Sequence, residues 1–434
     1  MSTDTKPPTA EYSLTRGYRT YIFILLFLLY FFDVVDRYMV SSLFPFIQKE
    51  WGLTDTQSGL LVSTVYWAIV ILVFPISIAI DRWSRRKTIS LMAILWSIAS
   101  MACAFMGSFA QLFTARTFLG VGEAGYGTGG TAMIAGLYPM EKRARIMGLW
   151  NASIPLATAV GIALGGIIAT HWGWRAAFGL TAAPGFIVAV LFFFIKDYKT
   201  VDLVKTVTAK EGKPAKIRMK ASDTAREFLR TPTLILTYFG FAGVQFVAVA
   251  LITWLPTYFH RVSNIPLDEA GLKAGSIMLL AVIGAPLGGY LSDLWVKKKI
   301  NARLVLASIT TIVSAILIFA AFFLFNGNIQ YAVLLVMGIF ITAFLPGAAA
   351  VTQEVIHPGL RAMSYALAVI FMNLLGASLG PLVIGAISDA SNIQTAMMIL
   401  PAFLVVAAVL FFIGSFFFEK DYNKVERVQL EMEA

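Results

Sequence analysis

Long apolar runs separated by short polar loops follow one another along almost the whole chain. A helix needs roughly 20 apolar residues to cross a hydrocarbon core about 30 Å thick. Twelve runs of that kind occur, near residues 21–43, 57–80, 88–107, 111–137, 145–170, 175–195, 231–259, 269–296, 302–325, 329–353, 361–388 and 394–418. Because they lack the period-two alternation of a barrel strand, and because backbone groups in lipid must be satisfied internally, they predict twelve transmembrane helices.

One long polar interval, 196–230, divides these runs into two sets of six. We expect it to be a solvated linker with surface helices, and a basic face on anionic headgroups is the alternative. The predicted organisation is a tail over 1–20, a six-helix bundle over 21–195, the linker over 196–230, a second six-helix bundle over 231–418 and a tail over 419–434.

The two halves also repeat one another in sequence. The segment SIAIDRWSRRK, with Asp81, follows the second run, and GGYLSDLWVKKK, with Asp293, follows the eighth. Arg145 opens the fifth run and Arg361 opens the eleventh, at a similar separation. Such self-similarity indicates an internal repeat. Two similar bundles around a midplane cavity are typical of transporters that rock between two open states.

Composition and charge exclude a soluble protein. Hydrophobic residues make up 58% of the chain and charged residues 13%, whereas soluble domains are about 45–50% apolar and about 25% charged. The net charge of +10 is not gathered on one face, as a nucleic-acid partner would require. With the N-terminus placed inside, 28 of 34 Lys and Arg residues fall on the cytoplasmic side. The positive-inside rule therefore predicts a cytoplasmic (inner) membrane protein with both termini in the cytoplasm, and no removable signal peptide is evident.

Five ionisable residues fall inside the predicted spans, where lipid makes each of them costly. They are Asp33, Asp36 and Arg37 in the first span, and Arg116 and Glu123 in the fourth. Glu123 lies two helical turns beyond Arg116, on much the same face and near the midplane. Because apolar surroundings favour the neutral form of an acid and a nearby arginine opposes this, these acids have the properties that proton coupling needs. We therefore predict Glu123, Asp36 and Asp33 as proton-coupling residues. A permanent set of salt bridges is the alternative.

The loops that repeat carry a recognisable pattern. Asp81, Arg82, Arg86 and Lys87 spell Asp-Arg-x3-Arg-Lys, and Asp293, Lys297 and Lys298 repeat it in part. The pattern resembles the major facilitator superfamily over essentially the whole chain. The resemblance implies a gate at the cytoplasmic helix ends, and a solvated charged loop is the alternative. The expected gate residues are Asp81, Arg82, Arg85, Arg86, Asp293, Lys297, Arg145 and Arg361.

Two branches of that superfamily resemble this chain in their intramembrane charges. Both have Asp-Arg in the first span and Arg-x3-Gly-x-x-Glu-Ala in the fourth, which here begins at Arg116. They are the anion:cation symporters and the spinster-like carriers of sphingolipids and lysolipids. The resemblance implies Glu123 as proton carrier and both arginines as partners of an anionic group. Asp33 departs from the Asn that such families usually have, so the number of protons stays open.

The remaining polar residues of the spans are too few for a polyhydroxylated ligand. The predicted substrate-binding residues are Arg37, Arg116, Gln245, Asn373, Asn151 and Tyr126. A mostly apolar cavity with a basic spot suits a mono- or aromatic carboxylate. We therefore predict a proton-coupled symporter of a rather apolar organic anion that works by alternating access. A spinster-like lysolipid or sphingolipid carrier is the runner-up, followed by a sugar-acid symporter and a non-transporting sensor.

Nothing in the chain indicates an enzyme. The GxGxxG at 120–125 lies inside a predicted membrane helix rather than after a strand, so it is not a dinucleotide fingerprint. The three histidines lie far apart in sequence, without the spacing of metal ligands. We expect no metal and no cofactor, with the proton gradient as energy source. The expected partners are a small-molecule or lipid substrate, protons and the bilayer, but no nucleic acid, and the protein is expected to be a monomer.

Overall fold

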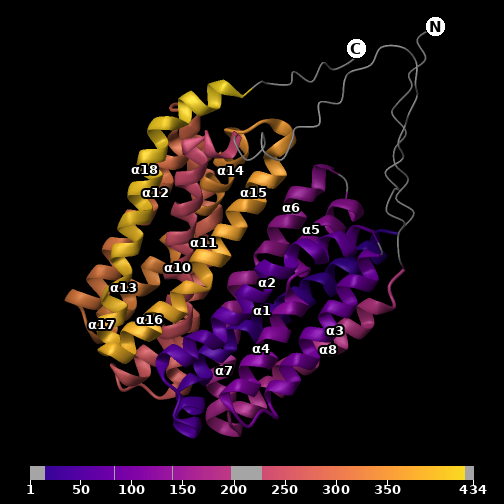
Figure 1. Cartoon of the computed structure of the whole chain (residues 1–434), viewed down its shortest axis with the longest axis vertical. Coiled ribbons are helices and arrows are strands. Elements are labelled where there is room, and N and C mark those ends of the chain that lie inside the picture. Colours follow the sequence, from indigo (N-terminus) through magenta and orange to yellow (C-terminus); the bar gives the residue numbers. More distant parts are fainter. Residues whose placement is uncertain (1–14, 83, 139, 197–226, 426–434) are drawn as a thin grey trace.

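A computed structural model describes residues 15–82, 84–138, 140–196 and 227–425. Helices of the first half form one body and those of the second half form another beside it (Figure 1). The first half contains α1 (Arg16–Trp51), α2 (Asp55–Arg82), α3 (Arg85–Cys103), α4 (Phe109–Glu123), α5 (Tyr126–Leu137), α6 (Met140–Asn151), α7 (Ser153–Trp172) and α8 (Trp174–Phe193). The second half contains α10 (Pro232–Arg261), α11 (Leu267–Val296), α12 (Ala302–Phe319), η1 (Ala320–Leu324), α13 (Gly327–Phe340), α14 (Leu345–Glu354), η2 (Pro358–Leu360), α15 (Arg361–Phe371), η3 (Met372–Ala377), α16 (Leu379–Ala390), α17 (Ile393–Met398) and α18 (Leu400–Lys424).

The predicted all-helical fold is confirmed, since no strand occurs in the described residues. Within these residues, nine helices are long and apolar enough to cross a membrane. The three other predicted spans coincide with α1, α3 and the pair α4–α5. Helices α1 and α4 carry the intramembrane charges, and α3 begins with basic residues. All twelve predicted runs are therefore helical.

Five of the predicted runs are interrupted in the structure. Three of these breaks lie at residues 341–344, at Ser378 and at Ile399, and the other two have a clear cause in the sequence. The run 111–137 breaks at Ala124 and Gly125, between α4 and α5. Glycine is a poor helix former, and this run contains several glycines on both sides of the break. The run 145–170 breaks at Ala152, between α6 and α7. Pro155 has no N–H to offer the Asn151 carbonyl four residues earlier, so the helix cannot continue through this point without losing a bond.

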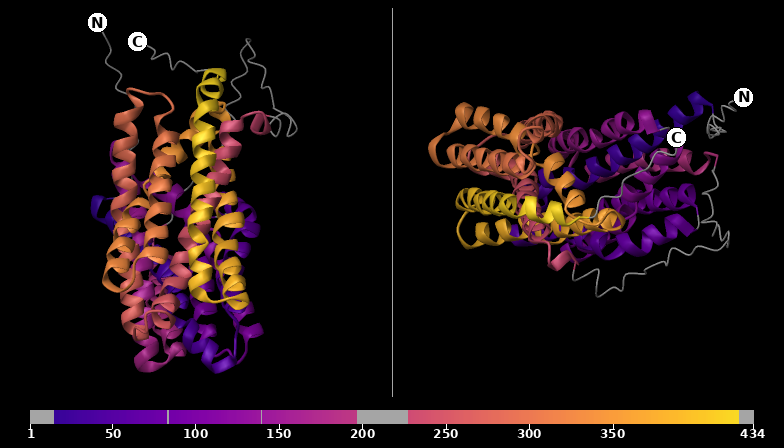
Figure 2. Two further views of the ribbon diagram at one scale, coloured as in Figure 1. Left: turned by 90° about the vertical axis from the view of Figure 1, so that its left-hand side faces the viewer. Right: turned by 90° about the horizontal axis from the view of Figure 1, so that it is seen from above.

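The two halves meet at the end of the molecule opposite the termini. We call this the closed end; it holds the end of α1 at Trp51 and the end of α10 at Arg261. The other end, where α1 begins and α18 ends, is the terminal end. The halves lie together at the closed end and diverge towards the terminal end (Figure 1). Seen from above, they stand side by side (Figure 2, right).

Small residues line the contacts between the halves. Helix α7 packs on α11, and α2 packs on α16. A Cβ atom added to Gly275 of α11 would lie 2.6 Å from the Ala159 carbonyl oxygen of α7. A Cβ atom on Gly59 of α2 would lie 2.5 Å from the Pro381 carbonyl oxygen of α16. Helices that approach so closely through small residues can slide past one another without interlocked side chains.

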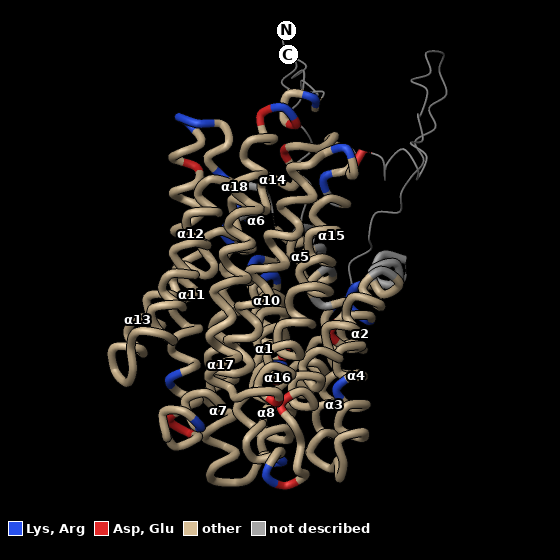
Figure 3. The backbone as a smooth tube through the Cα atoms, turned by 60° about the vertical axis from the view of Figure 1, so that its left-hand side comes forward, with Lys and Arg blue, Asp and Glu red and all other residues tan. Residues whose placement is uncertain are grey.

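Charged residues lie mainly near the two ends of the helices, and much of the tube between the ends is free of charge (Figure 3). The main exceptions are the charges of α1 and α4, which are buried inside the first half. This distribution is the one expected when the middle of the molecule faces hydrocarbon.

Candidate functional site

One arginine of α1 holds two carboxylates inside the first half. Arg37 Nη2 donates to Asp33 Oδ2 at 3.0 Å, one helical turn earlier. Arg37 Nε lies 2.8 Å from Glu123 Oε2, at the last residue of α4. Both carboxylate side chains are fully buried, whereas 14% of the Arg37 side chain is exposed. We call Asp33, Arg37 and Glu123 the charge cluster.

Two glycines explain why Glu123 lies so close to α1. A Cβ atom on Gly120 would lie 2.5 Å from the Val65 carbonyl oxygen of α2. A Cβ atom on Gly122 would lie 2.6 Å from the backbone nitrogen of Trp96 in α3. Residues two apart point to different sides of a helix, so the pair lets α4 fit tightly between two neighbours. The glycine pattern therefore serves helix packing, as expected once it was placed in a membrane helix.

Arg116 is buried beside the cluster and bonds to backbone rather than to carboxylates. Its Nε donates to the Leu61 carbonyl at 3.1 Å and its Nη2 donates to the Arg37 carbonyl at 3.3 Å. The third nitrogen, Nη1, has no hydrogen-bond partner and is buried. Arg116 thus ties α4 to the main chains of α1 and α2. In this conformation it offers no exposed surface to an anion.

Asp36 points away from Arg37, toward α3 and α8. Its Oδ1 accepts hydrogen bonds from the hydroxyls of Ser100 and, at 3.2 Å, of Thr181. Its Oδ2 is buried without a hydrogen-bond partner. The sequence predicted these charges to line one cavity at adjacent levels. The structure joins Asp33, Arg37 and Glu123 directly and places Asp36 on the flank, inside the first half.

Aromatic side chains lie near Arg37. The Arg37 guanidinium carbon lies 6.0 Å from the ring centroid of Tyr66. The hydroxyls of Tyr66 and Tyr38 are 2.7 Å apart and share a hydrogen bond. Tyr30 stacks on Trp150, with ring centroids 4.5 Å apart. Arg37 is therefore a cation with aromatic neighbours, which favours a ligand that combines an anionic group with an apolar body.

The other predicted substrate-binding residues lie elsewhere. Gln245 of α10 and Asn373 of η3 are half-buried in the second half, and Asn151 is exposed at the end of α6. Within the described part of the chain, none of the three hydrogen-bonds to the charge cluster. The side chain of Tyr126 lies outside the described residues. Asn373 lies in a π-helical segment, a feature often found at functional sites.

The predicted gate residues lie at the terminal end, where the described ones contact their own half. Arg86 Nη1 donates to the Ile195 carbonyl at 2.6 Å, within the first half. Asp293 pairs with Arg303 at 3.3 Å, within the second half. Arg85 begins α3, and Lys297, Arg145 and Arg361 are exposed. The side chains of Asp81 and Arg82 lie outside the described residues.

Polar residues that the sequence analysis missed join the two halves at the closed end. Arg261, the last residue of α10, pairs with Asp55 of α2 through both of its terminal nitrogens, at 2.8 and 2.9 Å. Gln48 bonds to both, accepting from Arg261 at 2.7 Å and donating to Asp55 at 2.7 Å. Ser388 of α16 also donates to Asp55, at 2.6 Å. Asp55 is buried although it lies at a helix end.

A second carboxylate of the second half completes this connection. Asp389 accepts from the backbone N–H groups of Asp55 and Thr56 at 2.8 Å each, and from the Thr56 hydroxyl at 2.6 Å. It therefore caps the N-terminus of α2 from the other half. We call Gln48, Asp55, Thr56, Arg261, Ser388 and Asp389 the closed-end latch. A signal existed in the sequence, since Asp55, Arg261 and Asp389 all fall at predicted outer ends of spans.

A third polar contact strengthens the closed end within the first half. Glu50 Oε2 accepts from Arg175 at 2.8 Å and from the Trp174 ring nitrogen at 2.7 Å. Glu50 lies beyond the apolar run of α1, and these hydrogen bonds lower its pKa. These contacts join the end of α1 to the start of α8.

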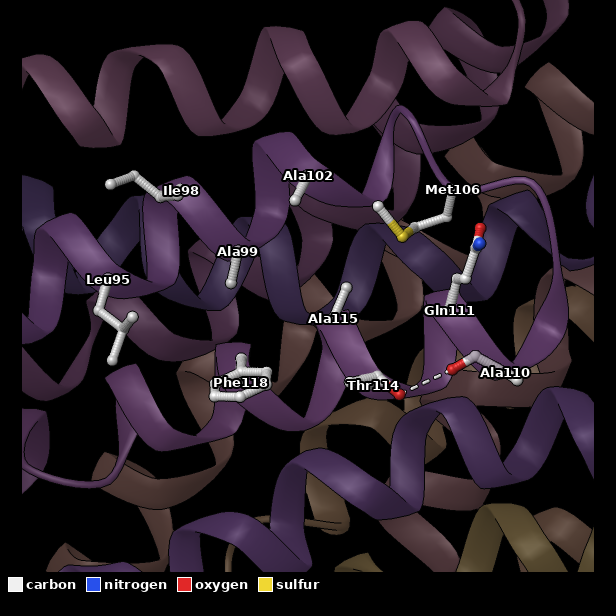
Figure 4. A pocket seen from close by; sticks show the side chains of 10 residues that line it. All are labelled: Leu95, Ile98, Ala99, Ala102, Met106, Ala110, Gln111, Thr114, Ala115 and Phe118. Atoms are coloured by element: carbon white, nitrogen blue, oxygen red, sulfur yellow. Dashed lines mark hydrogen bonds between the residues drawn. The ribbon is translucent and has the colours of Figure 1, made fainter.

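Neither a groove on the first half nor a cavity at the closed end is lined by a residue of the charge cluster. A groove of about 550 Å³ lies between α3 and α4, and ten mostly apolar residues line it (Figure 4). Phe118 and Ile98, which line it, are more than half exposed, so the groove opens on the outside of the first half. The other cavity, of about 450 Å³, lies at the closed-end latch beside Asp55 and Arg261.

Known proteins resemble the chain over most of its length. The family model of the Major Facilitator Superfamily matches residues 26–377. The hexuronate transporter of Bacillus subtilis (strain 168) is 29% identical over 297 residues, which cover 66% of this chain and 67% of that protein. Protein spinster homolog 1 of Xenopus laevis is 24% identical over 436 residues, which cover 93% and 82%. A solved bacterial homologue of the human lysosomal transporter spinster, inward-facing and unoccupied, has a TM-score of 0.81 at 22% identity, and the match covers 94% of this chain and 99% of that chain.

Proposed function

We propose that this chain, which belongs to the Major Facilitator Superfamily, symports a rather apolar organic anion with protons by alternating access. The family match over residues 26–377 confirms the resemblance and the facilitator fold predicted from the sequence. It also makes the chain a membrane transporter and not an enzyme. The anion and the proton coupling are our proposal, and both derive from the charge cluster.

The observation that carries the proposal is that Arg37 is the one exposed member of a buried charge cluster. Its side chain is 14% exposed, whereas Asp33 and Glu123 are fully buried. An anion that reaches Arg37 must compete with the two carboxylates that already hold it. A guanidinium offers several N–H donors in a fixed plane, which suits the exchange of one carboxylate for another.

Proton coupling follows from what happens to a displaced carboxylate. Without its arginine, an ionised Glu123 would be a buried charge without a partner, and such groups take up a proton instead. The bound anion would favour protonation of Glu123, because it takes away the arginine that balances the ionised carboxylate. Protonation of Glu123 would in turn favour anion binding, because it leaves Arg37 free to pair with the anion. Two ligands that bind together in this way are carried in the same direction, which is symport.

The closed-end latch supports an alternating-access cycle. With the termini in the cytoplasm, as the distribution of Lys and Arg predicts, the closed end faces outward and the structure opens inward. The similar solved structure is also described as inward-facing. Rocking at the glycine-lined pairs α7–α11 and α2–α16 would break the latch and open the site to the other side. An inward proton gradient would then drive uptake.

A spinster-like lipid carrier is the second candidate. It is favoured by the extent of one similarity, because the match to the Xenopus spinster homologue covers 93% of this chain. The aromatic neighbours of Arg37 would suit an anionic headgroup with an apolar body. The groove between α3 and α4 opens on the outside of the first half, and none of the three residues of the charge cluster lines it.

Purified protein in liposomes with a trapped pH dye tests both candidates. We expect one or more monocarboxylates or aromatic acids to acidify the lumen above protein-free liposomes. Glu123→Gln should abolish this acidification while anion exchange persists, because the anion still finds Arg37. The exposed Glu419→Gln is the matched control and should behave as wild type.

Two other outcomes would contradict the proposal. If exchange and acidification fall together in Glu123→Gln, the cluster is a structural salt bridge. If no small acid, sugar acids included, acidifies the lumen while a fluorescent lysolipid moves between leaflets, the protein is a lipid carrier.

A further inference from the structure

The charge cluster contains two acids, Asp33 and Glu123, and only one arginine, Arg37. Asp33 and Glu123 share Arg37, which leaves this part of the cluster with an excess negative charge when both acids are ionised. Asp36 and Arg116 on the flank carry opposite charges and offset one another. Tyrosine hydroxyls nearby are neutral at ordinary pH. An ionised carboxylate buried without compensation is expensive, and such a group binds a proton instead.

We propose that Asp33 and Glu123 share one resident proton in the substrate-free carrier, in addition to the proton that moves with the anion. This inference rests on the proposed function only for the second, transported proton. With the resident proton in place, the five buried ionisable residues sum to zero charge.

The geometry at Arg37 brings the two acids together. Asp33 binds Nη2 and Glu123 lies against Nε, and these two nitrogens form one edge of the guanidinium. Carboxyl groups on the same edge lie side by side. Two carboxylates confined in this way do not both ionise, because like charges at short range oppose each other.

The free oxygens of the two acids provide the place for the proton. Asp33 Oδ1 and Glu123 Oε1 are both buried and have no hydrogen-bond partner. A hydroxyl on one of them would donate to the neighbouring carboxylate, which satisfies both atoms at once. Asp36 does not belong to this pair, because its Oδ1 accepts hydrogen bonds from Ser100 of α3 and Thr181 of α8.

The groups that face this pair come from three helices. Helix α1 supplies Tyr30 and Tyr38, α2 supplies Tyr66, and α4 supplies Arg116. The only cation among them, Arg116, bonds to backbone carbonyls and so does not compete with the proton for either carboxylate. Asp36 and Cys103, on the far side, add no positive charge.

The resident proton has a consequence for coupling. When a monoanion binds Arg37, the neutral site must take up one further proton to remain neutral. The loaded carrier then holds two protons, and the empty carrier returns with one. One proton is therefore transported with each monoanion, although two acids can be protonated.

Infrared difference spectroscopy on the substrate-free protein tests for the resident proton. We expect the C=O stretching band of a protonated carboxyl group at neutral pH in wild type. Asp33→Asn and Glu123→Gln should each lose this band, Asp33→Glu should keep it, and the matched control Glu419→Gln should keep it. Thermal unfolding and gel filtration of each variant establish that it is folded. Absence of the band in folded wild type would overturn the inference.

Proton uptake on anion binding, measured with a pH electrode, gives an independent count. We expect one proton per anion in both wild type and Asp33→Asn, because only the transported proton is taken up. Two protons in wild type and one in Asp33→Asn would overturn the inference while proton coupling stands. The band present without any proton uptake would support the resident proton and overturn the proposed symport.

Discussion

Arg37 is the residue on which the site depends, and much about it could be predicted. Charged residues inside apolar runs are so costly that their presence alone pointed to Asp33, Arg37 and Glu123. Asp33 and Arg37 are four residues apart, the spacing at which two residues of a helix share a face. The contact between α1 and α4 could not be predicted, since it depends on how Gly120 and Gly122 fit against two other helices.

Arg116 shows what sequence reasoning at single positions leaves out. Its depth and charge predicted a substrate ligand, whereas its guanidinium bonds to the carbonyls of Leu61 and Arg37. Backbone acceptors are the same for every residue type, so no sequence pattern reveals such a partner.

Arg116→Lys should therefore lower stability more than it lowers anion affinity in the folded fraction. An ammonium is a point charge that cannot reproduce the planar fork, so at least one buried carbonyl loses its partner. We expect a loss of about 1–3 kcal/mol in the free energy of unfolding, the usual cost of an unsatisfied buried group. Thermal unfolding in detergent, with and without anion, measures it. A variant as stable as wild type that no longer binds the anion would instead place Arg116 in the binding site.

At the scale of elements, hydrophobic patterning predicted the helices but not their interruptions. Twelve apolar runs correspond to helices throughout the described residues. The breaks at Ala124–Gly125 and at Ala152 lie inside runs that read as continuous. Hydropathy reports burial and says little about backbone hydrogen bonds, so for these two breaks the clues were Pro155 and the clustered glycines.

The contact between α7 and α11 is the element-scale feature most open to a test. Gly275→Val should hinder closure, because a Cβ there would lie 2.6 Å from the Ala159 carbonyl oxygen. The main chain cannot yield as a flexible side chain does, so the helices must separate. We expect a several-fold rise in the labelling rate of a cysteine placed at Thr170, on α7 near the closed end.

Gly148→Val is the matched control for this substitution, since nothing lies within 4 Å of a Cβ added there. It should leave the labelling rate unchanged. An unchanged rate in Gly275→Val as well would mean that the pair α7–α11 does not limit opening.

At the scale of the whole molecule, the two-bundle architecture follows from the internal repeat, but the state of the carrier does not. The repeat predicts two related bodies and therefore two ways of closing them. Which end is closed depends on partners far apart in sequence, such as Asp55, Arg261 and Asp389. The sequence motif predicted a gate at the terminal end, whereas no motif marks the closed-end latch.

Asp389→Asn should shift the whole molecule away from the closed-end conformation. The substitution removes a charge that accepts three hydrogen bonds from the start of α2. A helix cap contributes about 1 kcal/mol, which corresponds to roughly a fivefold change in the ratio of two states. Double electron–electron resonance between labels at Lys49 and Gln394 measures the distribution of distances across the closed end. We expect a larger long-distance population than in wild type.

Asp268→Asn, a substitution of the same kind at the start of α11, is the control for that measurement. Asp268 accepts a hydrogen bond from the neighbouring Glu269 N–H, and within the part of the chain that the structure describes its side chain bonds to no residue of the first half. A distance distribution that is the same in both variants would mean that the latch does not hold the closed end.

The capping of α2 by Asp389 means that secondary structure itself changes with the transport cycle. A helix whose first N–H groups are satisfied by another body loses that satisfaction whenever the two bodies part. The first turn of α2 must then find water or fray, and it re-forms on closure. Where that turn frays, opening the closed end unwinds a small piece of the fold, and closing it rewinds the same piece. The free energy of hydrating that helix end therefore contributes to the energy barrier between the two open states of the carrier.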